Sequence, residues 1–249
     1  MRDIQMNPNQ MTTVCLMLCL TIGCGTSTPD VDSDPSRSAS EPAGDEHHYF
    51  HATEQPHAAE WSYAGNTSPE HWGELSPDYA LAGSGTHQSP IDVAAPTPAE
   101  LPQLQFDYHP SAIDLVYNGH TIEEIEDKAS RLTFRDQKFT LEQFHFHSPS
   151  EHTVDGRHFD MEMHLVHKSD DGRVAVIGVF IEAGESNPAF DSVWDYLPNA
   201  DRQEQKSRTA VDALTLLPKS PRYYSYTGSF TTPPCTEDVL WMLMVSPVQ

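Results

Sequence analysis

The stretch QFHFHSPSEHT, residues 143–153, places two histidines one residue apart between two phenylalanines. Successive side chains of a β-strand point to opposite faces of the sheet. His145 and His147 therefore share one face with Gln143. Phe144 and Phe146 share the opposite face. The alternation predicts a strand that buries one apolar face and presents a polar face able to do chemistry.

A second segment, DMEMHLVH at residues 160–167, alternates in the same way. Its methionines and leucine face one side, and Glu162, His164 and Val166 face the other. If the two strands are neighbours, His145, His147 and His164 come together as three neutral imidazoles. Three nitrogen ligands with a fourth position left open are a common catalytic zinc arrangement.

An imidazole that binds a metal also needs its second nitrogen held by a hydrogen-bond partner. Glu162 shares a face with His164, and Gln143 shares a face with His145. We therefore expect these two side chains to hold ligands in place. The alternative is that each histidine is a structural or solvated side chain. The joint pattern of H-x-H and E-x-H, with both opposite faces apolar, favours the metal site.

Short alternating apolar segments recur along the chain and are bounded by prolines and glycines. They predict strands at residues 113–117, 131–134, 139–147, 161–167 and 174–182. Residues 188–196 and 209–216 are predicted as short helices, each ended by a proline. The chain of 249 residues is long enough for one large core. We expect one mainly β (α+β) domain with a mostly antiparallel sheet.

The net charge of the chain indicates which classes of partner it can bind. With 37 acidic and 14 basic residues, the formal net charge is −23. Phosphate backbones bind to basic surfaces, so this balance argues against nucleic acid as a partner.

Residues 11–22, MTTVCLMLCLTI, are an apolar run that is too short to span a bilayer and typical of a signal peptide. Gly23 and Cys24 follow, and then a polar tract. We expect residues 1–24 to be a signal peptide of the lipoprotein type, with Cys24 lipidated and attached to a membrane. An ordinary secretory signal is the alternative. Both predict an exported bacterial protein, in the periplasm or on the outer membrane or cell surface.

Residues 25–60 are expected to form a polar, disordered linker. Four histidines fall between residues 46 and 60 without regular spacing, which favours a flexible lead-in over a zinc-storage segment. Cys15 and Cys19 would leave with the signal peptide, so Cys235 remains without a partner for an internal disulfide.

Several segments, in chain order, resemble the α-class carbonic anhydrases. Besides residues 143–167, they are WSYAG at 61–65, HWG at 71–73, QSPID at 88–92, NGH at 118–120 and YYSYTGSFTTPPCTE at 223–237. The resemblance covers residues 61–249 and is closest to exported bacterial members. It implies a large twisted, mostly antiparallel sheet with a few short peripheral helices and a conical cavity that reaches a zinc ion.

This resemblance implies reversible hydration of CO2 to bicarbonate and a proton by attack of zinc-bound hydroxide. It makes Zn²⁺ the cofactor, held by the three histidines, with Glu162 orienting one of them. It also implies that Thr231 accepts a hydrogen bond from the hydroxide and donates one to Glu151. Thr232 lies beside the bound anion. His120 is the proton shuttle, since a histidine with a pKa near 6.5 can pass a proton to buffer.

The resemblance also implies an apolar pocket for CO2, lined by Val166, Val176, Phe230 and Trp241. From the residues alone, the valines are equally well explained as core and the Thr-Thr-Pro-Pro run as a rigid turn. In the same way, His120 is explained as a solvated turn residue and Glu151 as a surface acid.

The sequence departs from the family pattern at four places. Ala82 stands where a cysteine would pair with Cys235, and Phe230 replaces the usual leucine. Glu123 stands where asparagine or glutamine is usual, and we expect it to raise the pKa of His120 or to hold a water chain. The sequence stops at Gln249, shortly after an apolar strand at 239–245, so we expect the carbonic anhydrase domain to lack its C-terminal end.

Three other functions are alternatives to the zinc enzyme. A carbonic-anhydrase-like binding module without catalysis would typically have lost a zinc histidine, and this chain keeps all three. A zinc-dependent esterase would be a side activity of the same site. A zinc-storage protein would depend on the histidines before residue 60. The oligomeric state is left open.

Overall fold

The structure is a computed structural model, in which residues 59–126, 129–197 and 204–249 are described. The chain divides into two units, Met1–Ala59 and Glu60–Gln249. The predicted signal peptide, Cys24 and the linker as far as residue 58 lie outside the described residues.

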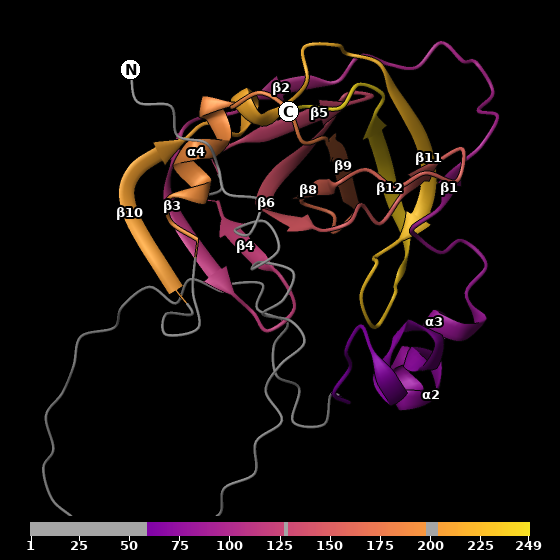
Figure 1. Cartoon of the computed structure of the whole chain (residues 1–249). Coiled ribbons are helices and arrows are strands. Elements are labelled where there is room, and N and C mark those ends of the chain that lie inside the picture. Colours follow the sequence, from indigo (N-terminus) through magenta and orange to yellow (C-terminus); the bar gives the residue numbers. More distant parts are fainter. Residues whose placement is uncertain (1–58, 127–128, 198–203) are drawn as a thin grey trace, which may run out of the picture. The chain divides into compact units, whose positions relative to one another are not determined.

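A ten-stranded sheet forms most of the second unit, in the order β10-β3-β4-β6-β8-β9-β12-β11, with β5 pairing to both β6 and β2 (Figure 1). Its strands are β2 (Gln105–Asp107), β3 (Ser111–Tyr117), β4 (Ile122–Ile125), β5 (Arg131–Phe134), β6 (Gln137–His147), β8 (Met161–Lys168), β9 (Val174–Ile181), β10 (Glu204–Val211), β11 (Tyr223–Ser229) and β12 (Glu237–Met244). The pair β12–β9 is parallel and the other pairs of this sheet are antiparallel. The mainly β fold with a mostly antiparallel sheet is confirmed.

The remaining elements are short. Strands β1 (Asp92–Val93) and β7 (Thr153–Val154) form a separate parallel pair. The helices are η1 (Gly65–Thr67), η2 (Pro69–His71), α2 (Trp72–Leu75), η3 (Pro77–Tyr79), α3 (Leu81–Ser84), α4 (Pro188–Trp194) and η4 (Ala213–Leu216). Within the described ranges, no helix has the length and hydrophobicity needed to cross a bilayer.

One predicted helix is wrong in its first half. Residues 209–211 belong to β10, and only Ala213–Leu216 is helical. The strand pairs antiparallel with β3, from Glu204 opposite Val116 to Val211 opposite Ser111. Pairing with β3 satisfies backbone groups of both strands, which outweighs a weak local preference for helix. The side chain of Asp212 then caps η4 by accepting from the backbone N–H of Leu214.

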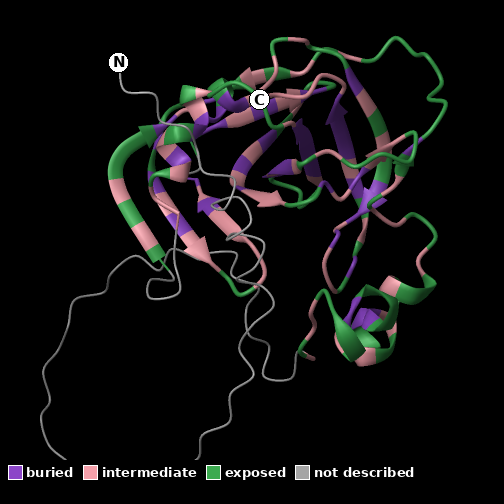
Figure 2. Ribbon diagram, viewed as in Figure 1, coloured by how far each residue is buried: buried purple, intermediate pink, exposed green. Residues whose placement is uncertain are grey.

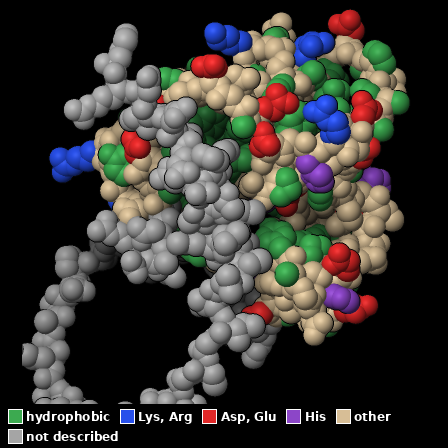
Figure 3. Space-filling model, viewed as in Figure 1, with side chains coloured by type: hydrophobic (Ala, Val, Ile, Leu, Met, Phe, Trp, Pro, Cys, Tyr) green, Lys and Arg blue, Asp and Glu red, His purple; other side chains and the backbone are tan. Residues whose placement is uncertain are grey.

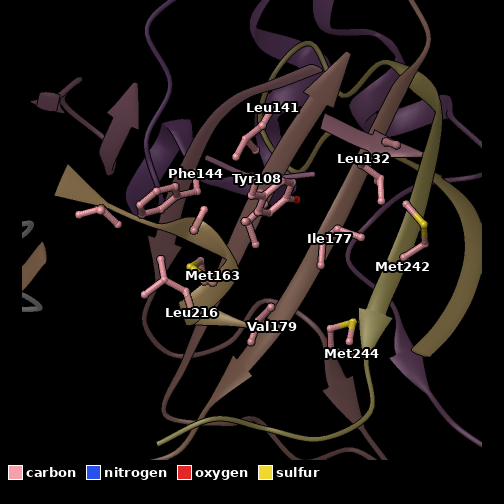
Figure 4. Close-up of a cluster of buried hydrophobic side chains, with 14 of the residues drawn as sticks. Tyr108, Leu132, Leu141, Phe144, Met163, Ile177, Val179, Leu216, Met242 and Met244 are labelled. Atoms are coloured by element: carbon pink, nitrogen blue, oxygen red, sulfur yellow. The ribbon is translucent and has the colours of Figure 1, made fainter. Parts of the chain in front are cut away.

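The predicted alternation sets which face of the sheet is the core. Phe144 of β6, Met163 of β8 and Ile177 of β9 are fully buried in one hydrophobic cluster, which also contains Met242 of β12 (Figure 4). The central strands are accordingly the most buried part of the sheet (Figure 2). The face opposite this cluster is therefore left for the histidines. On the face seen in Figure 3, acidic and basic side chains are scattered among hydrophobic ones.

Strand β4 carries a carboxylate into the interior. Glu124 is 1% exposed, and burial raises its pKa to about 8, although both of its oxygens accept from the backbone N–H of Asp114. The folded state therefore holds a proton on Glu124 that the unfolded state releases above about pH 4.5. Stability from this group is present at low pH and is lost as the pH rises from about 4.5 to 8.

We expect Glu124→Gln to stabilise the protein at high pH, because glutamine keeps an acceptor for Asp114 and carries no charge. The free energy of unfolding should rise by on the order of 2 kcal/mol at pH 9 and be unchanged near pH 4. Urea unfolding at both pH values measures this, with the exposed Glu100→Gln as the control. Equal effects of Glu124→Gln at the two pH values would contradict the assignment.

Candidate metal centre

The register of β6 and β8 brings the three histidines together. His145 lies opposite His164, and His147 lies opposite Glu162. Each imidazole offers a ring nitrogen within 4.8 Å of those of the other two. The ring centroids are separated by 4.9 Å for His145 and His147, 5.2 Å for His145 and His164, and 4.6 Å for His147 and His164. Two strands thus supply one three-nitrogen cluster.

In two of the three histidines, a neighbouring side chain fixes which ring nitrogen faces a metal. His145 Nδ1 lies 2.8 Å from the Oε1 of Gln143, and His164 Nε2 lies 2.8 Å from the Oε1 of Glu162. Amide and carboxylate oxygens only accept hydrogen bonds, so these nitrogens carry the protons. His145 Nε2 and His164 Nδ1 therefore keep their lone pairs. The structure places Gln143 and Glu162 where the sequence predicted them.

The third histidine provides a test of whether a metal fits. His147 Nδ1 lies 3.3 Å from the Oε1 of Glu151. His147 Nε2 is buried and has no hydrogen-bond partner among the described residues. Leaving a buried polar atom unpaired costs about 1–3 kcal/mol, and a bound cation would satisfy it. Three uncharged nitrogens are a donor set that suits zinc.

The environment keeps all three imidazoles neutral. Burial lowers the pKa of His145 to about 3 and that of His147 well below its usual range. Burial also lowers the pKa of His164, against the opposing effect of Glu162. A metal ligand must be the neutral imidazole, so burial prepares the site for a cation.

A second cluster adjoins the first. His152 Nδ1 lies 2.7 Å from Glu162 Oε1, and the His152 backbone N–H donates to Oε2 at 2.9 Å. His152 Nε2 lies 2.6 Å from the hydroxyl of Tyr226, which lies 2.7 Å from Ser89 Oγ. His152, Glu162 and His164 are residue types that can bind a metal, but their polar side-chain atoms hydrogen-bond to one another. They form a hydrogen-bonded chain that fixes Glu162.

Glu162 is ionised within this set of hydrogen bonds. Burial by itself would raise its pKa, but the imidazoles of His164 and His152 and their hydrogen bonds lower it below the usual range. The roles of His152, Tyr226 and Ser89 were missed in the sequence. Ser89 and Tyr226 lie far from residues 143–167 in the chain, and no spacing pattern links them to Glu162.

Thr231 and Glu151 meet beside the histidines. Burial raises the pKa of Glu151 to about 8, and a hydrogen bond from the Thr231 side chain acts against that rise. Thr231 is buried and belongs to the loop between β11 and β12, together with Thr232. Glu151 Oε2 lies 3.9 Å from His164 Nδ1. The pair therefore lies at the metal-facing side of the histidine cluster, which is what the family resemblance implies.

The four predicted pocket residues come together on the same side of the sheet. Val166 pairs with Val176 across β8 and β9, and Val176 pairs with Trp241 across β9 and β12. Val176 and Trp241 belong to a second apolar cluster, separate from the main core, and Val166 and Phe230 pack against it. The Trp241 ring lies 4.8 Å from the ring of His164. An apolar surface thus borders the candidate metal centre.

His120 lies in the turn between β3 and β4, where its imidazole stacks on Trp61 with ring centroids 3.6 Å apart and an angle of 11°. Partial burial lowers the pKa of His120. The prediction that Glu123 raises this pKa is therefore wrong, because desolvation of His120 lowers its pKa. Glu123 instead accepts from Gln143 Nε2 at 3.4 Å and pairs with His145 across β4 and β6.

Fold and site together define a β-sheet protein with a three-imidazole centre beside an apolar pocket. Residues 67–249 match the family of eukaryotic-type carbonic anhydrases, and the chain belongs to this family of enzymes. The family is zinc-dependent and hydrates CO2.

Relatives and solved structures agree with this assignment. A carbonic anhydrase from Nostoc sp. is 44% identical over 195 residues, covering 76% of this chain and 74% of the relative. One from Pectobacterium carotovorum is 40% identical over 197 residues, covering 79% and 80%. The α-carbonic anhydrase from Thermovibrio ammonificans, solved with the inhibitor sulfanilamide, superposes with a TM-score of 0.75 at 41% identity and covers 77% of this chain and 86% of that one.

Proposed function

We propose that this chain catalyses the reversible hydration of CO2 to bicarbonate and a proton, with a zinc ion held by His145, His147 and His164. The observation that carries the proposal is the set of three neutral imidazoles, each with one nitrogen left for a metal. A bound zinc ion supplies a Lewis acid that lowers the pKa of a water molecule from 15.7 to about 7.

The residues around the centre have complementary tasks. Gln143 and Glu162 hold two of the imidazoles by their second nitrogens. When the Thr231 hydroxyl donates to Glu151, as the family resemblance implies, its oxygen lone pair is left to accept from a group that still carries a proton. Thr231 therefore selects and orients the nucleophile, and Thr232 lies next to it in the same loop. CO2 is apolar and is expected against Val166, Val176, Phe230 and Trp241.

The direct test is stopped-flow hydration of CO2 by the full chain after zinc loading. We expect rapid hydration that is lost when the metal is removed and returns with zinc. A folded, zinc-containing protein that hydrates no CO2 would overturn the proposal and leave a binding module instead.

We propose that His120 passes the released proton to buffer. With its pKa lowered by burial, it stays neutral and able to accept a proton over most of the physiological range. His120→Ala should lower kcat by on the order of 10-fold or more in dilute buffer, leave kcat/KM unchanged, and be rescued by added imidazole. His109→Ala, at an exposed position, is the control. An equal fall in kcat and kcat/KM would show a different role.

We also propose that the protein is exported and anchored to a membrane through lipidated Cys24, on the sequence of residues 11–24. Cell fractionation tests this, since Cys24→Ser should move the protein from the membrane to the soluble fraction. An unchanged distribution would favour an ordinary secretory signal.

A further inference from the structure

The loop that carries Thr231 and Thr232 runs from Phe230 to Thr236, between β11 and β12. It contains Cys235, which is a free thiol, so no disulfide ties the loop to another of the described residues. Cys235 has a positive φ of 56°, and Asp238 just beyond the loop has one of 68°. Non-glycine residues adopt this conformation at a cost of about 1 kcal/mol or more. The loop therefore has to be held by other contacts.

A polar clamp holds the C-terminal end of the loop. Glu237 Oε1 accepts from the backbone N–H of His87 at 2.7 Å and from Gln88 Nε2 at 3.1 Å. Gln88 Nε2 also donates to the carbonyl oxygen of Cys235 at 3.1 Å. We call Gln88 and Glu237, with these contacts, the clamp. It joins segments that are about 150 residues apart in the chain.

The hydrogen bonds of the clamp keep its carboxylate ionised. The backbone N–H of His87 and the Gln88 side chain lower the pKa of Glu237. Hydrogen bonds to an ionised acceptor are about twice as strong as those between neutral groups. The clamp also closes over Gly85, where any Cβ would collide with Gln88 Nε2, with Glu237 Oε1 and with the backbone carbonyl oxygen of Leu81. A glycine at this position is thus required for the clamp to form.

Residues 87–89, which include Gln88 of the clamp, also hold the N-terminal end of the loop. The backbone N–H of Ser89 donates to Ser229 Oγ at 2.9 Å, and the backbone N–H of Ser229 donates to Ser89 Oγ at 3.1 Å. Within the loop, the Phe230 N–H donates to the Thr236 carbonyl at 3.0 Å. Residues 87–89 therefore bind the residues on both sides of the loop, and Thr231 lies between the two points of attachment.

We propose that Glu237, acting with Gln88, is a positioning residue for the proposed CO2 hydration: the clamp fixes Thr231 over the metal centre in place of a covalent tie. The effect on rate rests on the proposed function. The hold on the loop does not, because Cys235 reports it independently. That thiol is buried, and burial raises its pKa to about 11, so it should react slowly while the loop stays closed.

The test compares Glu237→Gln and Gly85→Ala with the wild type, as full chains loaded with zinc. The first variant replaces one carboxylate oxygen by a donor and changes the clamp alone. The second adds a Cβ that collides with both clamp side chains and with the Leu81 carbonyl oxygen. The exposed Asp238→Asn is the matched control. Alkylation of Cys235 by iodoacetamide is followed by mass spectrometry of its peptide, which separates it from the other cysteines. Zinc content and the kcat/KM for CO2 hydration are measured on the same samples.

We expect both clamp variants to alkylate Cys235 at least about 10-fold faster and to lose about 10- to 100-fold in kcat/KM, because small misplacements of a catalytic group are costly. Zinc content should not change, since the histidines lie on β6 and β8. Unchanged alkylation in either folded variant would overturn the clamp. Faster alkylation with wild-type kcat/KM, or with loss of zinc, would overturn positioning of Thr231. A wild type without hydration activity would defeat the proposed function alone, and alkylation would still decide the clamp.

Discussion

His164→Ala should abolish zinc binding and CO2 hydration together. His164 contributes one of three metal-facing nitrogens, and Glu162 and His152 are arranged to hold it. Loss of a side chain that only orients a ligand already costs 10–100-fold in metal affinity, so loss of the ligand itself should cost more than about 100-fold. Zinc content after dialysis and stopped-flow hydration are the measurements.

The control for this substitution is His109→Ala, which removes an exposed imidazole. It should keep full zinc content and rate. A His164→Ala protein that retains one zinc ion and hydrates CO2 at the wild-type rate would show that the metal centre lies elsewhere. Circular dichroism of both variants distinguishes loss of the metal from loss of the fold.

Thr231→Val should slow hydration by about 10²–10³-fold while leaving zinc bound, since loss of one preorganised hydrogen-bonding group at a reacting centre has effects of this size. Valine keeps the shape of threonine and removes the hydroxyl that acts on the pKa of Glu151. Thr231→Ser restores a hydroxyl and should recover most of the rate. The measurement is kcat/KM for CO2 hydration, with bound zinc determined on the same samples.

The matched control is Thr236→Val, at an exposed position of the same loop. It should leave kcat/KM unchanged. If Thr231→Val and Thr236→Val behave alike, the Thr231 hydroxyl has no part in orienting the nucleophile. If Thr231→Val loses zinc as well as rate, the residue acts through the metal centre as a whole.

Alternation was enough to predict the parts of this structure in which one strand face is apolar. Phe144, Met163 and Leu165 go into the core, so the histidines on the same strands are left on the other face. The three-histidine site follows from two adjacent strands and needs little further information. This is why the cluster, and the side chains of Gln143 and Glu162 beside it, could be predicted from short segments.

Contacts between distant segments could not be predicted in this way. His152 reaches Tyr226, 74 residues away, and Gln88 reaches Glu237, 149 residues away. No periodicity connects such pairs, because they depend on how the strands order themselves in the sheet. The error at residues 209–211 has the same origin, since β10 is a strand only because β3 lies beside it.

The surroundings of individual side chains also could not be predicted from the sequence. The sequence suggested that Glu123 would raise the pKa of His120, but stacking on Trp61 partly buries the imidazole and lowers it. Glu124 likewise looks like one acid among several in residues 122–126 and proves to be buried. Desolvation depends on every neighbour in space, so it becomes visible only in the folded chain.

Zinc-dependent hydration by the three-histidine centre is tested most directly by a zinc titration of the metal-free full chain, with the initial rate of CO2 hydration measured at each addition. We expect the rate to rise in proportion to added zinc and to level off at one zinc ion per chain, since the described residues form one three-imidazole centre. Zinc that binds at one ion per chain without any rise in the rate, or a rate that does not depend on zinc, would contradict it.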